Sequence, residues 1–404
     1  MKLRIMLSLG IVFFANLSWS NEWHGISYGG KIRIYDNHHF FQNENVTNAS
    51  AFSAGGQLQM NKELSSQLSL HLGYYIANNL GANSDDPGKI ISLLPGENIN
   101  ILGEANFRLS YGNHQFSAGR IALDTPFANA ADAFMIPVTF LAGTGVLNFE
   151  GKSKISIGII DQFKDKESDE FVDTGTYITQ RFSSASTSFS TSADYFVGYQ
   201  RFLESGSFEI WDYYFSDLFN LFYIEGFYKI PHSEDLTSSL HLQMGMESEV
   251  GDKLLKTNVG TVDSQLFGVK YAIATRILKV MLSYNSVPEN KKAYNAGAWL
   301  SPFSFFTEAI YTNLMTSGIG NVHSGEAYKL MMDITGLPNF LFRIGYADFS
   351  FINDALSRKE TNFWIRWSPE IKKGVSIWLR TAFANATNDL NDLHAYRIQF
   401  QYEF

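Results

Sequence analysis

The chain has 404 residues, no cysteine and a formal net charge of −9 at pH 7. Without cysteine, a disulfide scaffold and a thiolate metal site are excluded. The acidic balance argues against a nucleic-acid partner, which would need a basic excess to neutralise phosphates. Aromatic residues make up 15% of the chain, although its mean hydropathy is only −0.10. This combination is typical of a transmembrane β-barrel, whose strands face lipid on one side and water on the other.

The amino terminus predicts a signal peptide over residues 1–20. Lys2 and Arg4 supply a positive start, residues 5–17 form an apolar run, and Ser18 and Ser20 are small residues beside a cleavage site. The alternative is an anchoring helix, but the run is shorter than the roughly 20 residues that a membrane span needs. We therefore expect an exported protein in which residues 21–404 form a single domain, and any membrane crossing to be made by strands.

Apolar and polar residues alternate in most segments between residue 25 and the carboxy terminus. In the last segment, Tyr396, Ile398 and Phe400 fall on one face while Arg397 and Gln399 fall on the other. Such alternation indicates a strand between two solvents. We predict an all-β, antiparallel transmembrane barrel of about 18 strands, within a range of 16–18, which closes by pairing the last strand with the first. Residues 174–182 are expected to be one of the strands, although the alternation is least clear from residue 174 to residue 192.

Basic residues recur on the polar face of the predicted strands. Arg343, Arg366, Arg380 and Arg397 occupy this face in the last segments, and closure would bring Lys31 and Arg33 of the first segment beside them. In a wide barrel, a column of fixed cations would attract anions or carboxylate groups. The alternative is a set of ordinary inward charges paired with carboxylates such as Glu403 and Asp348. The whole predicted basic face comprises Lys31, Arg33, Arg108, Lys270, Lys279, Arg343, Arg366, Arg380 and Arg397.

The least strand-like stretch covers residues 124–143. Pro126 and Pro137 cannot lie in a central strand, and the stretch is too apolar for a solvated loop. We expect it to fold into the lumen as a constriction loop. The residues assigned to this predicted constriction are Arg120, Asp124, Pro126, Asp132, Phe134, Pro137, Thr139 and Phe140.

Two motifs in this region resemble the OprD-type outer-membrane porins. Gly119-Arg120 leads into Thr125-Pro126, and a Pro-x-Thr-Phe sequence follows at residues 137–140. The resemblance extends over essentially the whole mature chain, and it implies an 18-stranded selective channel with inward-folded loops. Members of this family take basic amino acids, small peptides or carboxylates. The family usually carries an arginine where this chain has Phe134, a difference that would weaken contact with a carboxylate.

The histidines lie in no recognisable enzymatic motif. None of the nine sits in a His-Glu-x-x-His or a Gly-x-Ser-x-Gly context. Ser239 with His241 could form a hydrolase pair, and His38 with His39 could bind a metal, but chance spacing and a solvated loop explain them more simply. We therefore expect no enzyme activity, no cofactor and no metal.

The sequence favours a passive porin for small hydrophilic solutes in the outer membrane of a Gram-negative bacterium. A structural or adhesive barrel is the alternative, and an outer-membrane hydrolase is a weaker one. Expected partners are outer-membrane lipid and lipopolysaccharide, the solutes, and the barrel-assembly machinery through the C-terminal strand. The sequence leaves both a monomer and a trimer open.

Overall fold

The structure is a computed structural model, and it describes residues 22–23, 25–91, 94–150, 152–181, 188–303, 308–370, 373–388 and 392–404. The predicted signal peptide, residues 1–20, lies outside the described residues. Within the described ranges, no helix is both long enough and apolar enough to span a membrane.

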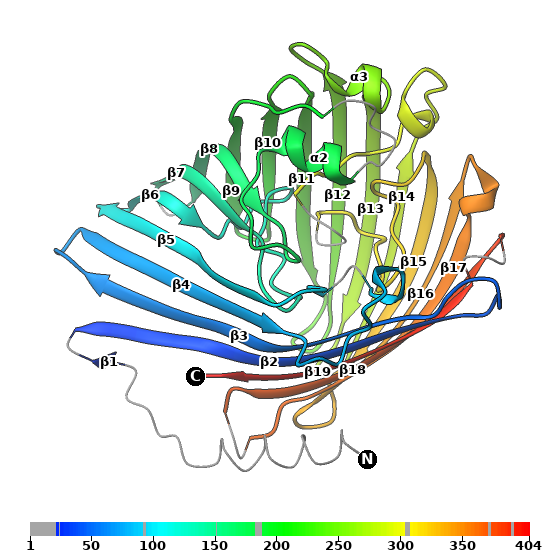
Figure 1. Cartoon of the computed structure of the whole chain (residues 1–404), viewed down its shortest axis with the longest axis horizontal. Helices are drawn as coiled ribbons and strands as arrows, with labels where there is room; N and C mark the ends of the chain where they lie inside the picture. Colours follow the sequence, from blue (N-terminus) through cyan, green and yellow to red (C-terminus); the bar gives the residue numbers. More distant parts are fainter. Residues whose placement is uncertain are drawn as a thin grey trace.

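The described chain forms one closed antiparallel β-barrel of 18 strands, β2 to β19, in which each strand pairs with its neighbour in sequence (Figure 1). The additional two-residue strand β1 pairs with the start of β2. The strands are β1 (Glu22–Trp23), β2 (Ile26–Phe41), β3 (Ala49–Glu63), β4 (Leu68–Asn78), β5 (Ile99–Tyr111), β6 (His114–Ile121), β7 (Thr139–Phe149), β8 (Ser153–Lys164), β9 (Asp194–Leu203), β10 (Gly206–Phe215), β11 (Phe219–Pro231), β12 (Thr237–Glu249), β13 (Asp263–Ala274), β14 (Leu278–Val287), β15 (Gly325–Ile334), β16 (Phe340–Phe351), β17 (Arg358–Trp367), β18 (Val375–Ala386) and β19 (Leu393–Glu403). The helices are short: η1 (Pro87–Lys89), α2 (Thr174–Arg181), α3 (Leu255–Asn258), η2 (Tyr294–Ala296) and η3 (Asp354–Leu356).

The strand alternation appears as two differently solvated faces. In β19, Tyr396 and Ile398 are exposed on the outside, while Ala395 and Arg397 are buried on the inside. The same pattern recurs in β13, where exposed Phe267, together with its outward neighbours, faces away from the lumen. An apolar exterior and a polar interior are what a barrel needs when lipid surrounds it. The predicted fold class and the closure of the barrel are therefore confirmed.

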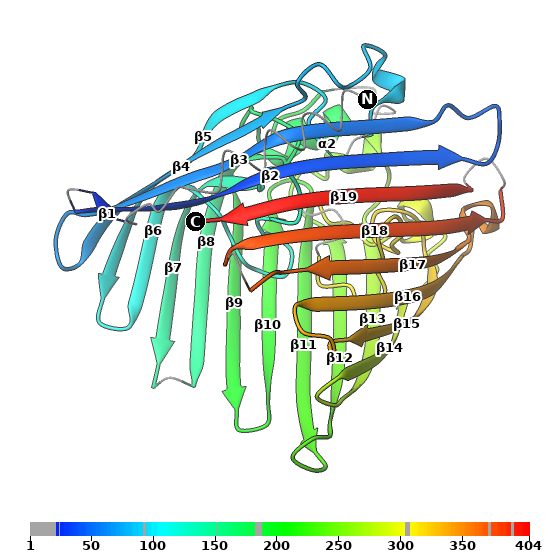
Figure 2. The same ribbon diagram turned by 90° about the horizontal axis from the view of Figure 1, so that it is seen from below.

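The last strand pairs with the first to close the barrel, as Figure 2 shows for β19 and β2. Their register runs from Leu393 opposite Phe41 to Glu403 opposite Lys31. The terminal Phe404 continues this pairing, because its N–H donates to the carbonyl of Gly30 and the N–H of Gly30 donates back, both at 3.1 Å. Within the described ranges, each of the strands β2 to β19 is thereby paired on both sides, so the closed sheet leaves none of them as an open edge towards lipid.

The strand predicted over residues 174–182 is wrong, because residues Thr174–Arg181 form helix α2. Asp173 precedes this helix, and its carboxylate accepts hydrogen bonds from the N–H of Thr176 at 3.0 Å and the N–H of Thr191 at 2.8 Å. A carboxylate that accepts from the first turn is a helix N-cap. The helix buries Tyr177, whose ring lies 4.7 Å from that of Phe163. The connection between β8 and β9 is therefore a folded element and adds no strand to the barrel.

The largest buried apolar cluster lies against the inner wall, with the strand residues Trp211 and Tyr223 and the loop residues Phe127 and Trp299 among its members. Phe127 packs edge-on against Tyr223, with ring centroids 5.0 Å apart, and 5.8 Å from Trp299. Two connecting segments supply much of the loop side of this cluster: residues 122–138, between β6 and β7, and residues 288–324, between β14 and β15, of which 304–307 lie outside the described residues. Tyr177 of α2 and Leu255 of α3 add to it from two further connections. The core of the protein is thus formed between the barrel wall and its inward-packed connections.

Candidate solute pathway

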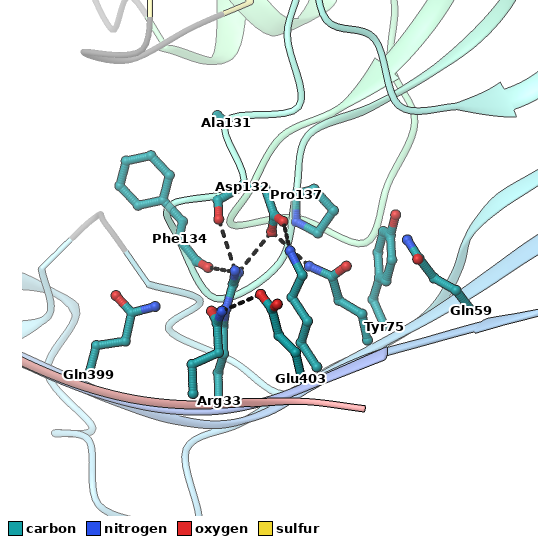
Figure 3. Close-up of polar contacts among 12 residues, drawn as sticks. Arg33, Gln59, Tyr75, Ala131, Asp132, Phe134, Pro137, Gln399 and Glu403 are labelled. Carbon is teal, nitrogen blue, oxygen red and sulfur yellow. Dashed lines mark hydrogen bonds and ion pairs between the residues drawn. The ribbon is translucent and has the colours of Figure 1, made fainter. Parts of the chain in front are cut away.

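The 122–138 segment is fixed to the inner wall by Asp132. Arg33 of β2 donates from Nη1 to the Asp132 carboxylate at 2.8 Å and from Nη2 to the Asp132 carbonyl at 2.9 Å. Lys31 forms a second ion pair with the same carboxylate, and Gln57 of β3 donates to it at 2.8 Å. Figure 3 shows Arg33 directed from the wall towards Asp132 and the backbone of Phe134. Two cations and an amide from adjacent strands therefore converge on one carboxylate of this segment.

The ion pairs also determine the charge state of Asp132, which lies outside the membrane-spanning strands. Burial opposes ionisation of this carboxyl, but the nearby charges of Arg33 and Lys31 outweigh that effect. Together they hold the pKa of Asp132 below its usual range. Asp132 is consequently an anion at neutral pH, and the contact is an ion pair under ordinary conditions.

The carboxy-terminal end of the segment is held by a lysine. Lys164, at the end of β8, is fully buried, and its ammonium donates to the carbonyl of Pro137 at 2.9 Å and to that of Asp165 at 2.7 Å. Lys166 lies over the ring of Phe134, 5.2 Å from its centroid. The phenyl ring of Phe134 thus contacts the ammonium group of Lys166, which belongs to the neighbouring connection. An arginine at position 134 would instead repel this lysine.

The remaining residues predicted for the constriction divide between loop and strand. Asp124 and Pro126 lie in a tight turn that the hydroxyl of Thr125 closes by donating to the carbonyl of Ala128 at 2.8 Å. Arg120 belongs to β6 and donates to the carbonyl of Leu102 at 2.9 Å. The irregular stretch ends at residue 138, so the predicted boundary at residue 143 is wrong: Thr139 and Phe140 begin β7. Thr139 and Phe140 pair in register with Lys164 and Phe163 of β8, so they belong to the barrel wall and not to the loop.

The 288–324 segment is a second connection held against the inner wall, and its contacts were not predicted. Both oxygens of Glu247 on β12 accept the N–H of Leu300 at 3.0 Å. Glu360 on β17 accepts the N–H of Met315 at 2.9 Å and the hydroxyl of Thr316 at 2.6 Å. Each carboxylate holds backbone donors that would otherwise be buried without partners, which costs about 1–3 kcal/mol per group.

A third carboxylate and a glycine complete the anchoring of this segment. Glu225 of β11 accepts the hydroxyl of Tyr311 at 2.8 Å. Gly245 of β12 leaves room for the indole of Trp299, because a Cβ atom at this position would lie 2.3 Å from the ring. The sequence did offer a signal for these contacts. Glu225, Gly245 and Glu247 fall on the inner face by strand alternation.

The predicted basic face divides into buried and accessible residues. Arg33, Arg380 and Arg397 are only 2%, 6% and 6% exposed, whereas Arg108, Lys279 and Arg366 are exposed and Lys31, Lys270 and Arg343 are half-buried. Arg343 forms an ion pair with Asp333 at 2.5 Å, and Lys270 lies 4.2 Å from the ring centroid of Tyr311. Arg108 lies 3.9 Å from Glu104.

Two tryptophans stand between the arginines of the last strands. The guanidinium carbons of Arg343 and Arg380 lie 5.0 and 5.7 Å from the ring centroid of Trp364. Those of Arg380 and Arg366 lie 5.5 and 5.0 Å from the ring of Trp378. Cation–π contacts of this kind hold the guanidinium groups in place along the wall. The sequence pattern located the arginines but missed the tryptophans on the same polar face.

Acidic groups lie across from these strands beside a cavity of about 760 Å³. Its lining includes Asp124 and Asp132 of the 122–138 segment and Glu209 of β10, together with Lys154 and Trp211. The cavity therefore presents carboxylates, one lysine and an aromatic surface to a solute beside the 122–138 segment.

A closed barrel of this size, with an apolar exterior and charged inner side chains, has the architecture of outer-membrane porins. Neither a protein-family model nor the sequence of a curated protein matches the chain. Solved structures do match it over nearly its whole length. The BenF-like porin from Pseudomonas fluorescens Pf-5 is 12% identical with a TM-score of 0.79, and the match covers 94% of this chain and 99% of that one.

Two further channels show the same likeness. The outer-membrane protein OpdK from Pseudomonas aeruginosa is 15% identical with a TM-score of 0.76, covering 94% of this chain and 98% of that one. OccAB3 from Acinetobacter baumannii is 13% identical with a TM-score of 0.78, covering 94% and 99%. The likeness confirms, at the level of the fold, the resemblance to OprD-type porins.

Proposed function

We propose that this protein is a passive outer-membrane channel for small hydrophilic solutes such as amino acids, small peptides or carboxylates. The observation that carries the proposal is the ion pairing of the 122–138 segment to the inner wall of a closed barrel. A segment fixed there narrows the lumen, and a narrowed aqueous lumen selects solutes by width and charge. One solved structure of OpdK contains vanillate, a carboxylate, which supports a carboxylate as one class of solute for this channel.

The charges along the proposed path supply the selectivity. Lys279, Arg343 and Arg366 remain accessible on one part of the wall, and Asp124 and Glu209 lie beside the cavity on another. A solute that carries both charges would be oriented between these groups, whereas a simple anion would follow the basic side. The buried cations Arg33, Arg380 and Arg397 hold the wall and its segments and attract solutes only at longer range.

The experiment that tests the proposal is planar-bilayer recording on the purified protein. We expect stepwise conductance, and a reversal potential in a salt gradient that shows preference for anions. An absence of conductance from folded protein would reject the channel, and a preference for cations would reject the role of the basic face. Adhesion to surfaces without conductance would favour the structural alternative.

A hydrolase is the second alternative, and one observation bears on it. The hydroxyl of Ser239 lies 3.3 Å from Nε2 of His241, and Nδ1 of His241 lies 3.8 Å from Glu225. Glu225 is already bonded to Tyr223 and Tyr311, so this carboxylate serves to hold the 288–324 segment. Labelling of Ser239 by a fluorophosphonate would reject our proposal that the protein performs no chemistry.

The proposal extends to export and assembly. The predicted signal peptide would direct the chain through the inner membrane of a Gram-negative cell, and the aromatic end of β19 would present the strand to the barrel-assembly machinery. Deletion of Phe404 removes both hydrogen bonds to Gly30. We expect this deletion to reduce the amount of heat-modifiable barrel in outer-membrane fractions, while substitution of Phe404 by Tyr should not.

A further inference from the structure

One cross-strand row on the inner wall holds buried polar groups that lack partners. Trp364, Arg380, Arg397 and Asn37 are consecutive register partners on β17, β18, β19 and β2, which lie side by side in Figure 2. Residues directly opposite each other on paired strands point to the same face. The four side chains therefore form one continuous row across the closing strands.

Every member of this row has a buried polar atom without a hydrogen-bond partner among the described residues. These atoms are Nε1 of Trp364, Nε of Arg380, Nε of Arg397, and both side-chain atoms of Asn37, which is fully buried. A buried polar atom without a partner costs about 1–3 kcal/mol, and more when the group is charged. Buried polar groups are usually hydrogen-bonded, so four exceptions in adjacent positions call for an explanation.

The row also concentrates positive charge. Arg380 and Arg397 face each other directly, and each is 6% exposed. Arg380 donates to the hydroxyl of Tyr35 and to the amide oxygen of Gln399, both at 2.7 Å, and Arg397 donates to the carbonyl of Met315 at 2.9 Å. These acceptors are all neutral. Among the residues that the structure describes, no carboxylate lies within ion-pair distance of either guanidinium, and Glu360 on the same wall is occupied by Met315 and Thr316.

Two buried like charges placed opposite each other repel. Glu360 attracts Arg397 from beyond ion-pair distance, so neither guanidinium has a carboxylate in direct contact, and such burial is costly. The unsatisfied atoms of the tryptophan and of both arginines are N–H donors, and the amide of Asn37 can present its NH₂ group. A row of donors with a double positive charge matches a small monovalent anion and does not match a cation.

A cavity reaches one member of this row, Arg397. It has a volume of about 480 Å³, and His39, Thr316 and Met315 line it together with Arg397. Nε2 of His39 is another buried atom without a partner in the described chain. The remaining lining is largely apolar, including Phe41 and Ile90, so an ion that reaches Arg397 would leave bulk water behind.

We infer that Arg380 and Arg397, with Asn37 and Trp364, form a buried binding site for a resident halide-sized anion that lies between the barrel wall and the 288–324 segment. The bound anion offsets one of the two opposed positive charges, and the carbonyl of Met315 remains on Arg397. The site stabilises the structure of the barrel, and this role does not depend on which solutes the channel transports.

The first test compares thermal unfolding of the detergent-solubilised protein in sodium chloride and in sodium gluconate at equal ionic strength. An anion that binds only the folded state raises the midpoint by mass action, here by about 2 °C for each tenfold rise in chloride above saturation. Bulky gluconate should give no such rise. Equal midpoints in the two salts would overturn the inference.

The second test uses matched variants. Arg380→Gln removes one of the opposed charges, so its unfolding midpoint should no longer depend on chloride and should equal or exceed that of the wild type in gluconate. Arg343→Gln is the control, because Arg343 lies next to Trp364 in the same row but is already paired with Asp333. Its chloride dependence should match the wild type. Chloride dependence retained in Arg380→Gln would reject the site.

A third measurement does not depend on variants folding. Crystals of the wild-type protein grown in sodium bromide should show an anomalous peak within hydrogen-bonding distance of the guanidinium groups of Arg380 and Arg397. Bromide found only at exposed lysines, with no peak in this row, would contradict the assignment.

Discussion

The carboxylate of Asp132 and the guanidinium of Arg33 are joined at 2.8 Å across a sequence separation of 99 residues. This contact holds an irregular segment against the wall of the barrel and brings the cavity beside Asp124 and Glu209 to its observed lining. The width and the charge of the proposed path thus depend on the same ion pair.

Asp132→Asn should release the 122–138 segment. The substitution leaves the buried guanidinium of Arg33 without its counter-charge, which should cost about 1–3 kcal/mol of unfolding free energy. Single-channel recording should show a larger and noisier conductance, and liposome swelling should show faster uptake of larger solutes. Asp85→Asn, in an exposed loop, is the control. Unchanged conductance in Asp132→Asn would show that the segment does not limit the path.

Conductance should respond to acid through Asp132. Because Arg33 and Lys31 hold the pKa of Asp132 below its usual value, the ion pair stabilises the docked segment above that usual value. The stabilisation is lost only as the pH falls through the lowered pKa. Conductance should therefore be constant from neutral pH down to the ordinary carboxyl range, near pH ~4, and rise below it. The Asp132→Asn variant should lack this transition, and a transition near pH 6 would point to another group.

Glu360→Gln should loosen the 288–324 segment. An amide at this position replaces an acceptor of two backbone N–H groups and a hydroxyl by a group with one acceptor oxygen. We expect a loss of about 1–3 kcal/mol in unfolding free energy and faster cleavage near residue 316 in limited proteolysis. Glu97→Gln, on an exposed loop, should change neither measurement.

Gly245→Ala should displace Trp299. A Cβ atom at this position would lie 2.3 Å from the indole, so the ring must move or the strand must shift. Overpacking of this kind typically costs about 1–3 kcal/mol. Gly226→Ala on the neighbouring β11 is the matched control, because a Cβ atom there meets nothing within 4 Å. Tryptophan fluorescence together with thermal unfolding would separate the two variants, and equal behaviour would contradict the close packing.

Charge reversal should show which basic residues a passing ion experiences. Lys279→Glu and Arg366→Glu alter exposed positions of the basic face and should shift the reversal potential towards cation preference. Lys89→Glu alters the last residue of η1, away from the basic face, and should give a smaller shift. If all three variants shift equally, the overall charge of the protein determines selectivity and the basic face does not.

The barrel could be predicted from the sequence because apolar and polar residues alternate along each strand, as they do in β19. This alternation shows which face of the strand meets lipid and which meets water. The same alternation placed Arg380 and Arg397 on the inner face. It could not show that they are buried, since Arg397 is covered by Met315, 82 positions away, and Arg380 contacts Tyr35, 345 positions away. Helix α2 was missed because its eight residues are too few to establish a helical period. The N-cap Asp173 was the local signal that could have identified it.

The partners of Arg33 were also beyond prediction. Pro126 and Pro137 showed that the chain leaves the sheet, but nothing local indicates which wall receives Asp132. That choice depends on the register of β2 against β3, which brings Lys31 opposite Gln57. Contacts between segments that are distant in sequence depend on how the whole barrel assembles. The residue pattern within one segment does not predict them.

Arg33 has a further partner, because its Nε donates at 2.6 Å to Gln401, which is 368 positions away along the chain. One side chain thus joins the first strand, the last strand and the segment beside β7. Contacts so distant in sequence form late in folding. A chain that has not yet received its final strand lacks one of the three contacts that orient this guanidinium, so its grip on Asp132 is incomplete. We therefore expect Arg33 to hold the 122–138 segment fully in place only after β19 has paired with β2.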